Sequence, residues 1–162
     1  MRRWMMTAAL LLAMGTPLPA WADDTADCLD PGDTLIKTEP ARVVSACRRL
    51  ADQGNAVGQY NLGWMYYKGQ GVPQNYAEAI KWFRKSADQG DAYGQSNLGV
   101  MYANGQGVPQ DYVQAEMWFN LAANQGNTDA AKNRDKAAAR MTPAQIEKAQ
   151  ALAAAWKPTT GQ

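Results

Sequence analysis

Residues 51–86 read ADQGNAVGQYNLGWMYYKGQGVPQNYAEAIKWFRKS, and residues 87–122 read ADQGDAYGQSNLGVMYANGQGVPQDYVQAEMWFNLA. The two stretches are identical at 22 of 36 aligned positions. A third and weaker copy begins with Ala123-Asn124-Gln125-Gly126. A period of this length is typical of solenoids, in which each repeat covers the apolar face of its neighbour. The repeat therefore predicts an extended surface rather than one enclosed site.

Each repeat carries two helical segments separated by a glycine- and proline-containing break. Asn55 and Asp91 are suited to cap the first helix of each copy, and Gly69 and Gly105 are suited to end it. The expected helices cover residues 55–68, 76–89, 91–104, 112–125, 128–140 and 142–156, with a degenerate second helix at 40–53 before them. We therefore predict an all-α chain, a short right-handed solenoid of about six helices in antiparallel pairs, preceded by an irregular N-terminal arm.

The repeated residues resemble a known family. The first copy contains Asn61-Leu62-Gly63-x-Met65-Tyr66, then Gly69-x-Gly71-Val72-Pro73-x-Asn75-Tyr76, then Ala79-x-x-Trp82-Phe83. These stretches resemble Sel1-like repeats, a branch of the tetratricopeptide-like helical solenoids, here of an exported bacterial type. One departure is glycine at positions 58 and 94, where such repeats usually carry alanine. Glycine costs about 1 kcal/mol in a helix, so we expect close helix approach or local looseness there.

The pattern divides the chain into six segments. Residues 1–22 resemble a signal peptide and residues 23–50 form an arm and a degenerate capping helix. Repeats follow at 51–86 and 87–122, then a degenerate repeat with a capping helix at 123–157 and a tail at 158–162. The last helix, which has Thr142 as its expected N-cap, should close the open end of the stack.

The first residues have the features of an export signal. Arg2 and Arg3 precede a short apolar run, and Ala20-Trp21-Ala22 matches a small-x-small cleavage site before Asp23. The apolar run is too short for a membrane span, although an uncleaved signal anchor is an alternative interpretation. We expect a periplasmic or secreted protein that does not stay in the membrane after cleavage.

The two cysteines, Cys28 and Cys47, both precede the first clear repeat. Export would place them in an oxidising compartment, so we expect a structural disulfide worth about 3 kcal/mol in the chain-entropy model. A redox-active pair is the alternative, but the Cys-x-x-Cys spacing is missing. The bridge would attach the N-terminal arm to the solenoid.

Charge and composition argue against several classes of ligand. Without Arg2 and Arg3 the chain has 14 basic and 15 acidic residues, since the full chain has 16 and 15. Such a balance lacks the basic field of nucleic-acid-binding proteins. Asp27, Asp30 and Asp33 do not have the spacing of a calcium loop, so we expect no metal and no cofactor.

The sequence also lacks the residues of common hydrolases. It contains no histidine, which removes the usual general base. None of Ser45, Ser86 and Ser96 is followed by lysine at the third position, as a serine β-lactamase would require. Some cysteine-rich Sel1-like proteins are linked to penicillin binding and β-lactam hydrolysis, but the repeats here contain no cysteine. We expect a non-enzymatic protein, with a β-lactam or cell-wall hydrolase as the alternative.

The positions that differ between the two copies suggest where a partner binds. In the first helices, apart from the caps, they are spaced by 3, 4, 3 and 1 residues, which places them on one helical face. The resemblance implies that this face lines a concave groove that binds a protein or peptide. The expected groove residues are Val57, Tyr60, Trp64, Tyr67, Lys68, Tyr93, Ser96, Val100, Ala103 and Asn104.

The two copies contribute differently to this groove. Exposed tyrosine and tryptophan are frequent binding hot spots, and Val100 and Ala103 should leave a shallow recess beside them. In the alternative interpretation, Trp64 and Tyr67 pack beneath the N-terminal arm. We expect a monomer, although a second copy covering the N-terminal edge is another possibility.

Overall fold

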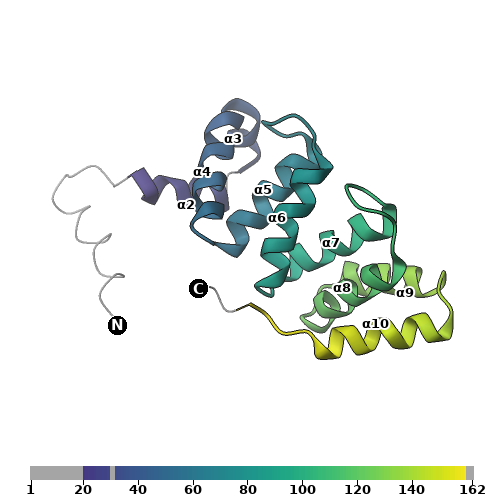
Figure 1. Ribbon diagram of the computed structural model, residues 1–162. Coiled ribbons are helices and arrows are strands. Elements are labelled where there is room, and N and C mark those ends of the chain that lie inside the picture. The colour runs from purple at the N-terminus through teal and green to yellow at the C-terminus, as the bar shows by residue number, and fades with distance from the viewer. Residues whose placement is uncertain (1–19, 30–31, 160–162) are drawn as a thin grey trace, which may run out of the picture.

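The computed structural model describes residues 20–29 and 32–159. Over these residues it contains nine α-helices and no strand, stacked into an elongated solenoid (Figure 1). The helices are α2 (Ala20–Leu29), α3 (Gly32–Thr38), α4 (Pro40–Asp52), α5 (Ala56–Lys68), α6 (Tyr76–Asp88), α7 (Ala92–Asn104), α8 (Tyr112–Asn124), α9 (Thr128–Ala138) and α10 (Pro143–Ala155). The predicted all-α class and the helices of the repeats are confirmed.

The helix boundaries follow from local capping. The side chains of Asn55 and Asp91 accept hydrogen bonds from the backbone N–H groups of Gly58 and Gly94, at 2.8 and 2.6 Å. α5 and α7 end at Gly69 and Gly105, which adopt the left-handed conformation with φ of 69° and 66°. Both kinds of cap satisfy backbone groups that a helix end leaves unpaired. These predicted caps are confirmed.

Identical residues of the two copies make identical contacts between helices. The side-chain amide of Gln59 donates to the carbonyl of Ala51 at 3.2 Å, and Gln95 donates to Ala87 at 3.3 Å. The same two glutamines accept hydrogen bonds from residues 89 and 125 at 2.7 and 2.8 Å. Buried amides need such partners, so the repeat preserves them at both positions.

The glycines that depart from the family pattern lie where helices approach closely. A Cβ atom at Gly58 would lie 2.7 Å from the Cβ of Leu50, and one at Gly94 would lie 2.5 Å from the Oγ of Ser86. Close approach between successive repeats, rather than local looseness, therefore accounts for these glycines. The absence of a side chain lets the next repeat pack directly on the preceding second helix.

The N-terminal segment is helical, which corrects the prediction of an irregular arm. α2 and α3 are short and carry no repeat pattern, so packing against α4 rather than local periodicity stabilises them. The predicted disulfide between Cys28 and Cys47 joins α2 to α4, and both cysteines are buried. Of the predicted signal peptide, residues 1–19 lie outside the described residues, and α2 runs through the expected cleavage position.

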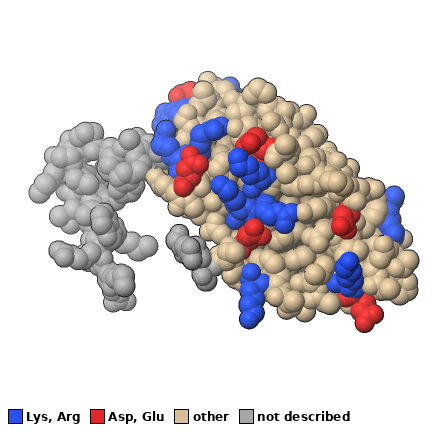
Figure 2. Space-filling model, in the orientation of Figure 1, with Lys and Arg blue, Asp and Glu red and all other residues tan. Residues whose placement is uncertain are grey.

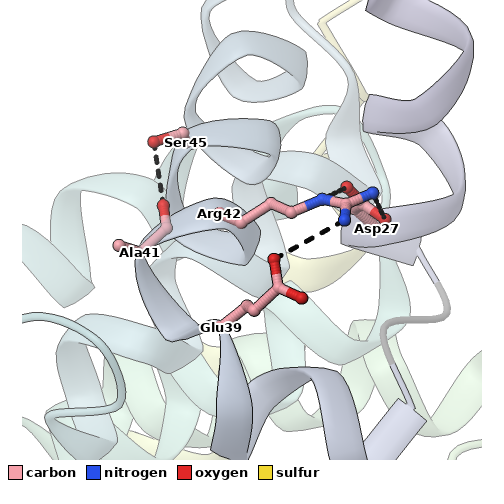
Figure 3. A network of polar contacts seen from close by, with 5 residues as sticks. All are labelled: Asp27, Glu39, Ala41, Arg42 and Ser45. Atoms are coloured by element: carbon pink, nitrogen blue, oxygen red, sulfur yellow. Dashed lines mark hydrogen bonds and ion pairs between the residues drawn. The ribbon is translucent and has the colours of Figure 1, made fainter.

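An ion pair holds the same two helices together (Figure 3). Arg42 of α4 contacts the buried carboxylate of Asp27 through two nitrogens, at 2.6 and 3.2 Å. Glu39 lies 3.6 Å from the same guanidinium. Two-pronged arginine–carboxylate pairs fix orientation as well as distance. Asp27, which the sequence suggested only as part of an acidic cluster, is thus a structural residue that positions α2.

The C-terminal helix packs on the last helix of the second repeat. The predicted capping box of Thr142 and Gln145 is confirmed, and α10 packs on α8 rather than on α9. The connection between α9 and α10 is shorter than the Gly-x-Gly-Val-Pro break of the full repeats, so it does not build the same hairpin. Beyond α10 the chain runs back towards α6, where Thr159 donates a backbone hydrogen bond to Asp88 at 2.7 Å (Figure 1).

Candidate functional site

Two hollows lie side by side along the face formed by the first helices of the repeats, α5, α7 and α9. Each has a volume of about 500 Å³. We call them the Tyr93 hollow and the Ala103 hollow. They share the lining residues Val100 and Asn133 and therefore adjoin, and we call the two together the groove.

The Tyr93 hollow lies between α5, α7 and the start of α9. Tyr93 is 62% exposed and its ring centroid lies 5.7 Å from that of Tyr60. Burial raises the pKa of the Tyr60 hydroxyl, with smaller contributions from Asp91 and Tyr93. The hollow is lined by Tyr60, Trp64, Ala92, Tyr93, Ser96, Asn97, Val100, Gln125, Gly126, Asn127, Thr128, Asp129 and Asn133. It therefore presents aromatic rings on one side and mainly polar groups on the other.

The Ala103 hollow lies between α7, α8 and α9. Its lining includes the buried Phe119 and the half-buried Tyr112, which we call its floor, and the exposed cationic residues Lys136 and Arg140, which we call its rim. The Arg140 guanidinium lies 5.9 Å from the centre of the Tyr112 ring. The lining residues are Val100, Ala103, Asn104, Gln110, Tyr112, Phe119, Asn133, Lys136, Ala137 and Arg140. None of them is acidic.

Seven of the ten predicted groove residues line these hollows. They are Tyr60, Trp64, Tyr93, Ser96, Val100, Ala103 and Asn104. Val57, Tyr67 and Lys68 line neither hollow. Val57 is exposed beyond the hollows, whereas Tyr67 and Lys68 pack at the C-terminal end of α5. The recess expected at Val100 and Ala103 is present.

The aromatic residues of α5 are half-buried and several of their rings pack against other side chains. The Tyr67 ring lies 5.5 Å from the ring of Tyr76 and 6.3 Å from that of Phe83. Lys68 places its ammonium group 4.8 Å from the centre of the Trp64 ring. Trp64 also lines a small hollow of about 110 Å³ beside Cys28. Trp64 thus lines both this small hollow beside the N-terminal segment and the groove.

Sequence reasoning missed the contribution of α9. Asn133, Lys136 and Arg140 lie 36 residues after Asn97, Val100 and Asn104. Extending the comparison of variable positions by one more period would have found two of them, at 136 and 140. The weak similarity of the third copy concealed them, because its helix is mostly polar and buries only Ala130 and Ala137.

Charged side chains of both signs are mixed on one face of the molecule (Figure 2). On the face shown in Figure 2, basic and acidic side chains lie close to one another rather than forming a field of one sign. Among the described residues no group of three or more histidine, cysteine or carboxylate side chains could hold a metal ion. In the same part of the chain, no helix has the length and apolar character needed to cross a membrane.

A known family of helical repeats matches the sequence of these stacked helix pairs. The Sel1 repeat family matches the chain twice, over residues 56–91 and 92–127. The chain is a Sel1-like repeat protein. The two matched copies contain α5 to α8, the helices that form most of the groove. No curated protein matches the sequence significantly.

Two solved structures resemble this Sel1-like repeat protein. One is c5321, a protective antigen of uropathogenic Escherichia coli with an SLR fold, which is 31% identical with a TM-score of 0.71 over 83% of this chain. The other is a Sel1 repeat protein from Oxalobacter formigenes, 34% identical with a TM-score of 0.56 over 58% of this chain. This chain spans only 32% and 39% of those proteins. The fold implies a scaffold for protein–protein interaction, and such proteins are in general not catalytic.

Proposed function

We propose that this Sel1-like repeat protein is an exported scaffold that binds a segment of a protein or peptide in the groove formed by the two hollows. It acts in the periplasm or after secretion, in envelope assembly or in the regulation of signalling. It works as a monomer, without catalysis and without a cofactor.

The continuity of the two hollows carries this proposal. Because the hollows adjoin at Val100 and Asn133, one extended segment can reach both of them. Tyr93 stands at the side of the groove with most of its ring in solvent. Exposed aromatic rings beside a recess are the usual anchors of protein interfaces.

The N-terminal features support export. Basic residues, an apolar run and a small-x-small site precede Asp23 in the order found in signal peptides. The disulfide between Cys28 and Cys47 is also of the kind that persists in oxidising compartments. Together they favour function outside the cytoplasm.

Tyr93 offers the sharpest test of the groove. We expect Tyr93→Ala to fold normally, because the ring is largely exposed, and to weaken capture of the native partner from cell-envelope extract by about tenfold or more. The measurement is a quantitative cross-linking pull-down with immobilised mature protein. Substitution of Tyr67 would be a poorer test, because its ring packs between Tyr76 and Phe83.

Val57→Ala is the matched control. Val57 is also exposed on α5, at 42%, but it lies outside both hollows, so the variant should capture the partner as the wild type does. Equal capture by the Tyr93 variant and the wild type would show that the groove does not bind the partner.

A further inference from the structure

The Ala103 hollow has the surroundings that hold an aromatic ring in the preceding repeat. Tyr76 and Phe83, which pack against Tyr67, correspond after one period to Tyr112 and Phe119 of the hollow. At the position of Tyr67 the second repeat carries Ala103. The ring is missing from the second repeat although these two aromatic neighbours are kept.

The hydrogen bonds made at this position are also repeated. Gln74 donates to the carbonyl of Tyr67 at 2.9 Å and to the hydroxyl of Tyr76 at 3.3 Å. Gln110 makes the equivalent bonds to Ala103 and Tyr112 at 2.7 and 3.1 Å. The backbone therefore has the same course at both places, and the difference lies in the missing side chain.

Helix α9 does not refill the space. Ala137 occupies the position one period after Met101, which is fully buried in the core cluster around Phe83. Lys136 and Arg140 correspond to Val100 and Asn104, and both are exposed residues that line the hollow. Smaller and charged residues thus leave the space between Tyr112 and Phe119 open.

The positive charges at the rim favour a negatively charged group in the bound segment. Within the described part of the chain Lys136 and Arg140 form no ion pair, and no acidic residue lines the hollow. A carboxylate next to the bound ring would meet two cations, and electrostatic complementarity of this kind favours one class of partner over others.

We propose that the Ala103 hollow binds an aromatic side chain, phenylalanine or tyrosine, that is flanked by aspartate or glutamate within the bound segment. The partner ring takes the place that Tyr67 fills in the first repeat, and the flanking carboxylate contacts Lys136 and Arg140. The inference deepens the proposed function and rests on it, because it names the segment that this part of the groove recognises.

The test uses fluorescein-labelled twelve-residue peptides and fluorescence polarisation. The probe carries one Glu-Phe-Asp stretch in a Gly/Ser background, and the comparison peptides replace phenylalanine by alanine or both acidic residues by lysine. We expect measurable binding of the probe alone at concentrations up to about 1 mM, the range of a weak isolated anchor. Failure of the probe to bind, or equal binding of the lysine-flanked peptide, would overturn the inference.

Two variants locate the binding. Ala103→Tyr refills the space with the residue that the first repeat tolerates, and Lys136→Glu with Arg140→Glu reverses the charge of the rim. Each should weaken probe binding by about tenfold or more. Ala151→Tyr and Lys148→Glu, at exposed positions on α10, are controls of size and charge and should bind as the wild type does.

The outcomes separate this inference from the proposed function. A melting curve monitors the fold of Ala103→Tyr. If Ala103→Tyr is unstable, the charge-reversed variant still tests the inference, because its two substitutions lie at exposed positions. If both variants fold and bind the probe as the wild type does, the inference is wrong. If the native partner is still captured through Tyr93 in that case, the proposed function stands without it.

Discussion

Position 103 carries alanine at a point where the first repeat has Tyr67. Both residues occupy the same turn of a helix that ends at a left-handed glycine two residues later. Their surroundings include a tyrosine and a phenylalanine in each case. The size of this side chain therefore contributes to whether this part of the surface is filled or hollow.

A second replacement between the copies places a charge in the core. Ile80 of the first repeat corresponds to Glu116, which is 2% exposed. Asn120 donates a hydrogen bond to its Oε1 atom at 2.9 Å, while Oε2 has no such bond from the described residues. Burial raises the pKa of Glu116, and the bond from Asn120 and the charge of Arg134 oppose this shift only in part.

This burial makes the stability depend on pH. Below its ordinary pKa the carboxyl of Glu116 is protonated in both the folded and the unfolded states, so burial of its charge costs nothing. As the pH rises above that value, the unfolded state loses the proton first, and the contribution of Glu116 to the free energy of unfolding falls until the folded-state pKa is passed. We expect Glu116→Gln to be more stable than the wild type at pH 7, by a margin that shrinks towards pH 4.

Urea unfolding at a series of pH values measures this margin. The exposed Glu147→Gln on α10 is the control and should show no such margin. The comparison is made between variant and wild type because burial also raises the pKa of Asp88, which adds to the pH dependence of both proteins. A margin for Glu116→Gln that stays constant with pH would contradict the expectation.

At the level of elements, α2 depends on tertiary attachments rather than on its own sequence. It is one of the shorter helices, and isolated helices of this length are marginal in water. The disulfide to Cys47 and the pair between Asp27 and Arg42 fasten it to α4 at adjacent positions. The pair alone contributes little, because the arginine is about half exposed.

Removal of the disulfide should therefore loosen one end of the solenoid. We expect the double variant Cys28→Ser, Cys47→Ser to lose about 3 kcal/mol in the free energy of unfolding, given the sequence separation of 19 residues. Hydrogen exchange should become faster in α2, while α7 and α8 keep their protection, because each repeat contacts mainly its neighbours. Ser45→Ala, at an exposed position on α4, is the control. Hydrogen exchange in α2 of the double cysteine variant as slow as in the wild type would contradict the expectation.

The C-terminal helix shows how a connection determines packing. Without the long glycine- and proline-containing break, α10 crosses to α8, where Trp156 meets Trp118 at a ring-centroid distance of 6.2 Å. α9 is then left as the terminal first helix, with a polar side facing away from the stack. The same departure leaves Lys136 and Arg140 available at the groove.

At the level of the whole molecule, the groove exists only because three repeats lie in series. Each hollow takes residues from at least two of the first helices. A single repeat would lack one side of either hollow. Partner binding should therefore be lost together with the stacking, even where the individual helices persist.

Export and cleavage of the signal peptide can be tested by cell fractionation and mass spectrometry. We expect the full-length chain, expressed in a bacterial host, to be recovered from the periplasmic fraction with the mass of residues 23–162 and an intact disulfide. Native mass spectrometry should show a monomer with or without reductant. The full-length mass in the membrane fraction would instead indicate an uncleaved signal anchor, and a dimer lost on reduction would contradict the monomer.

Much of the fold could be predicted because its determinants are local and repeated. The caps at Asn55 and Asp91 and the ends at Gly69 and Gly105 lie within a few residues of the groups they satisfy. The helices at Ala20–Leu29 and Gly32–Thr38 could not be predicted, because they are stabilised by contacts with α4. Likewise, the site was predicted from the first two copies of the repeat. It lacked α9, because the third copy resembles the first two only weakly.

The sequence by itself determined the family, the paired helices and the face on which the copies differ, because a 36-residue period repeats the same local chemistry. Only the tertiary structure decided which of those variable residues line a groove. Tyr67 and Ala103 share a helical face, yet one is packed between rings and the other opens a hollow. The side chain at this position and the helix that packs beside it, α7 in one case and α9 in the other, together set that difference, since burial depends on what each side chain meets across the interface.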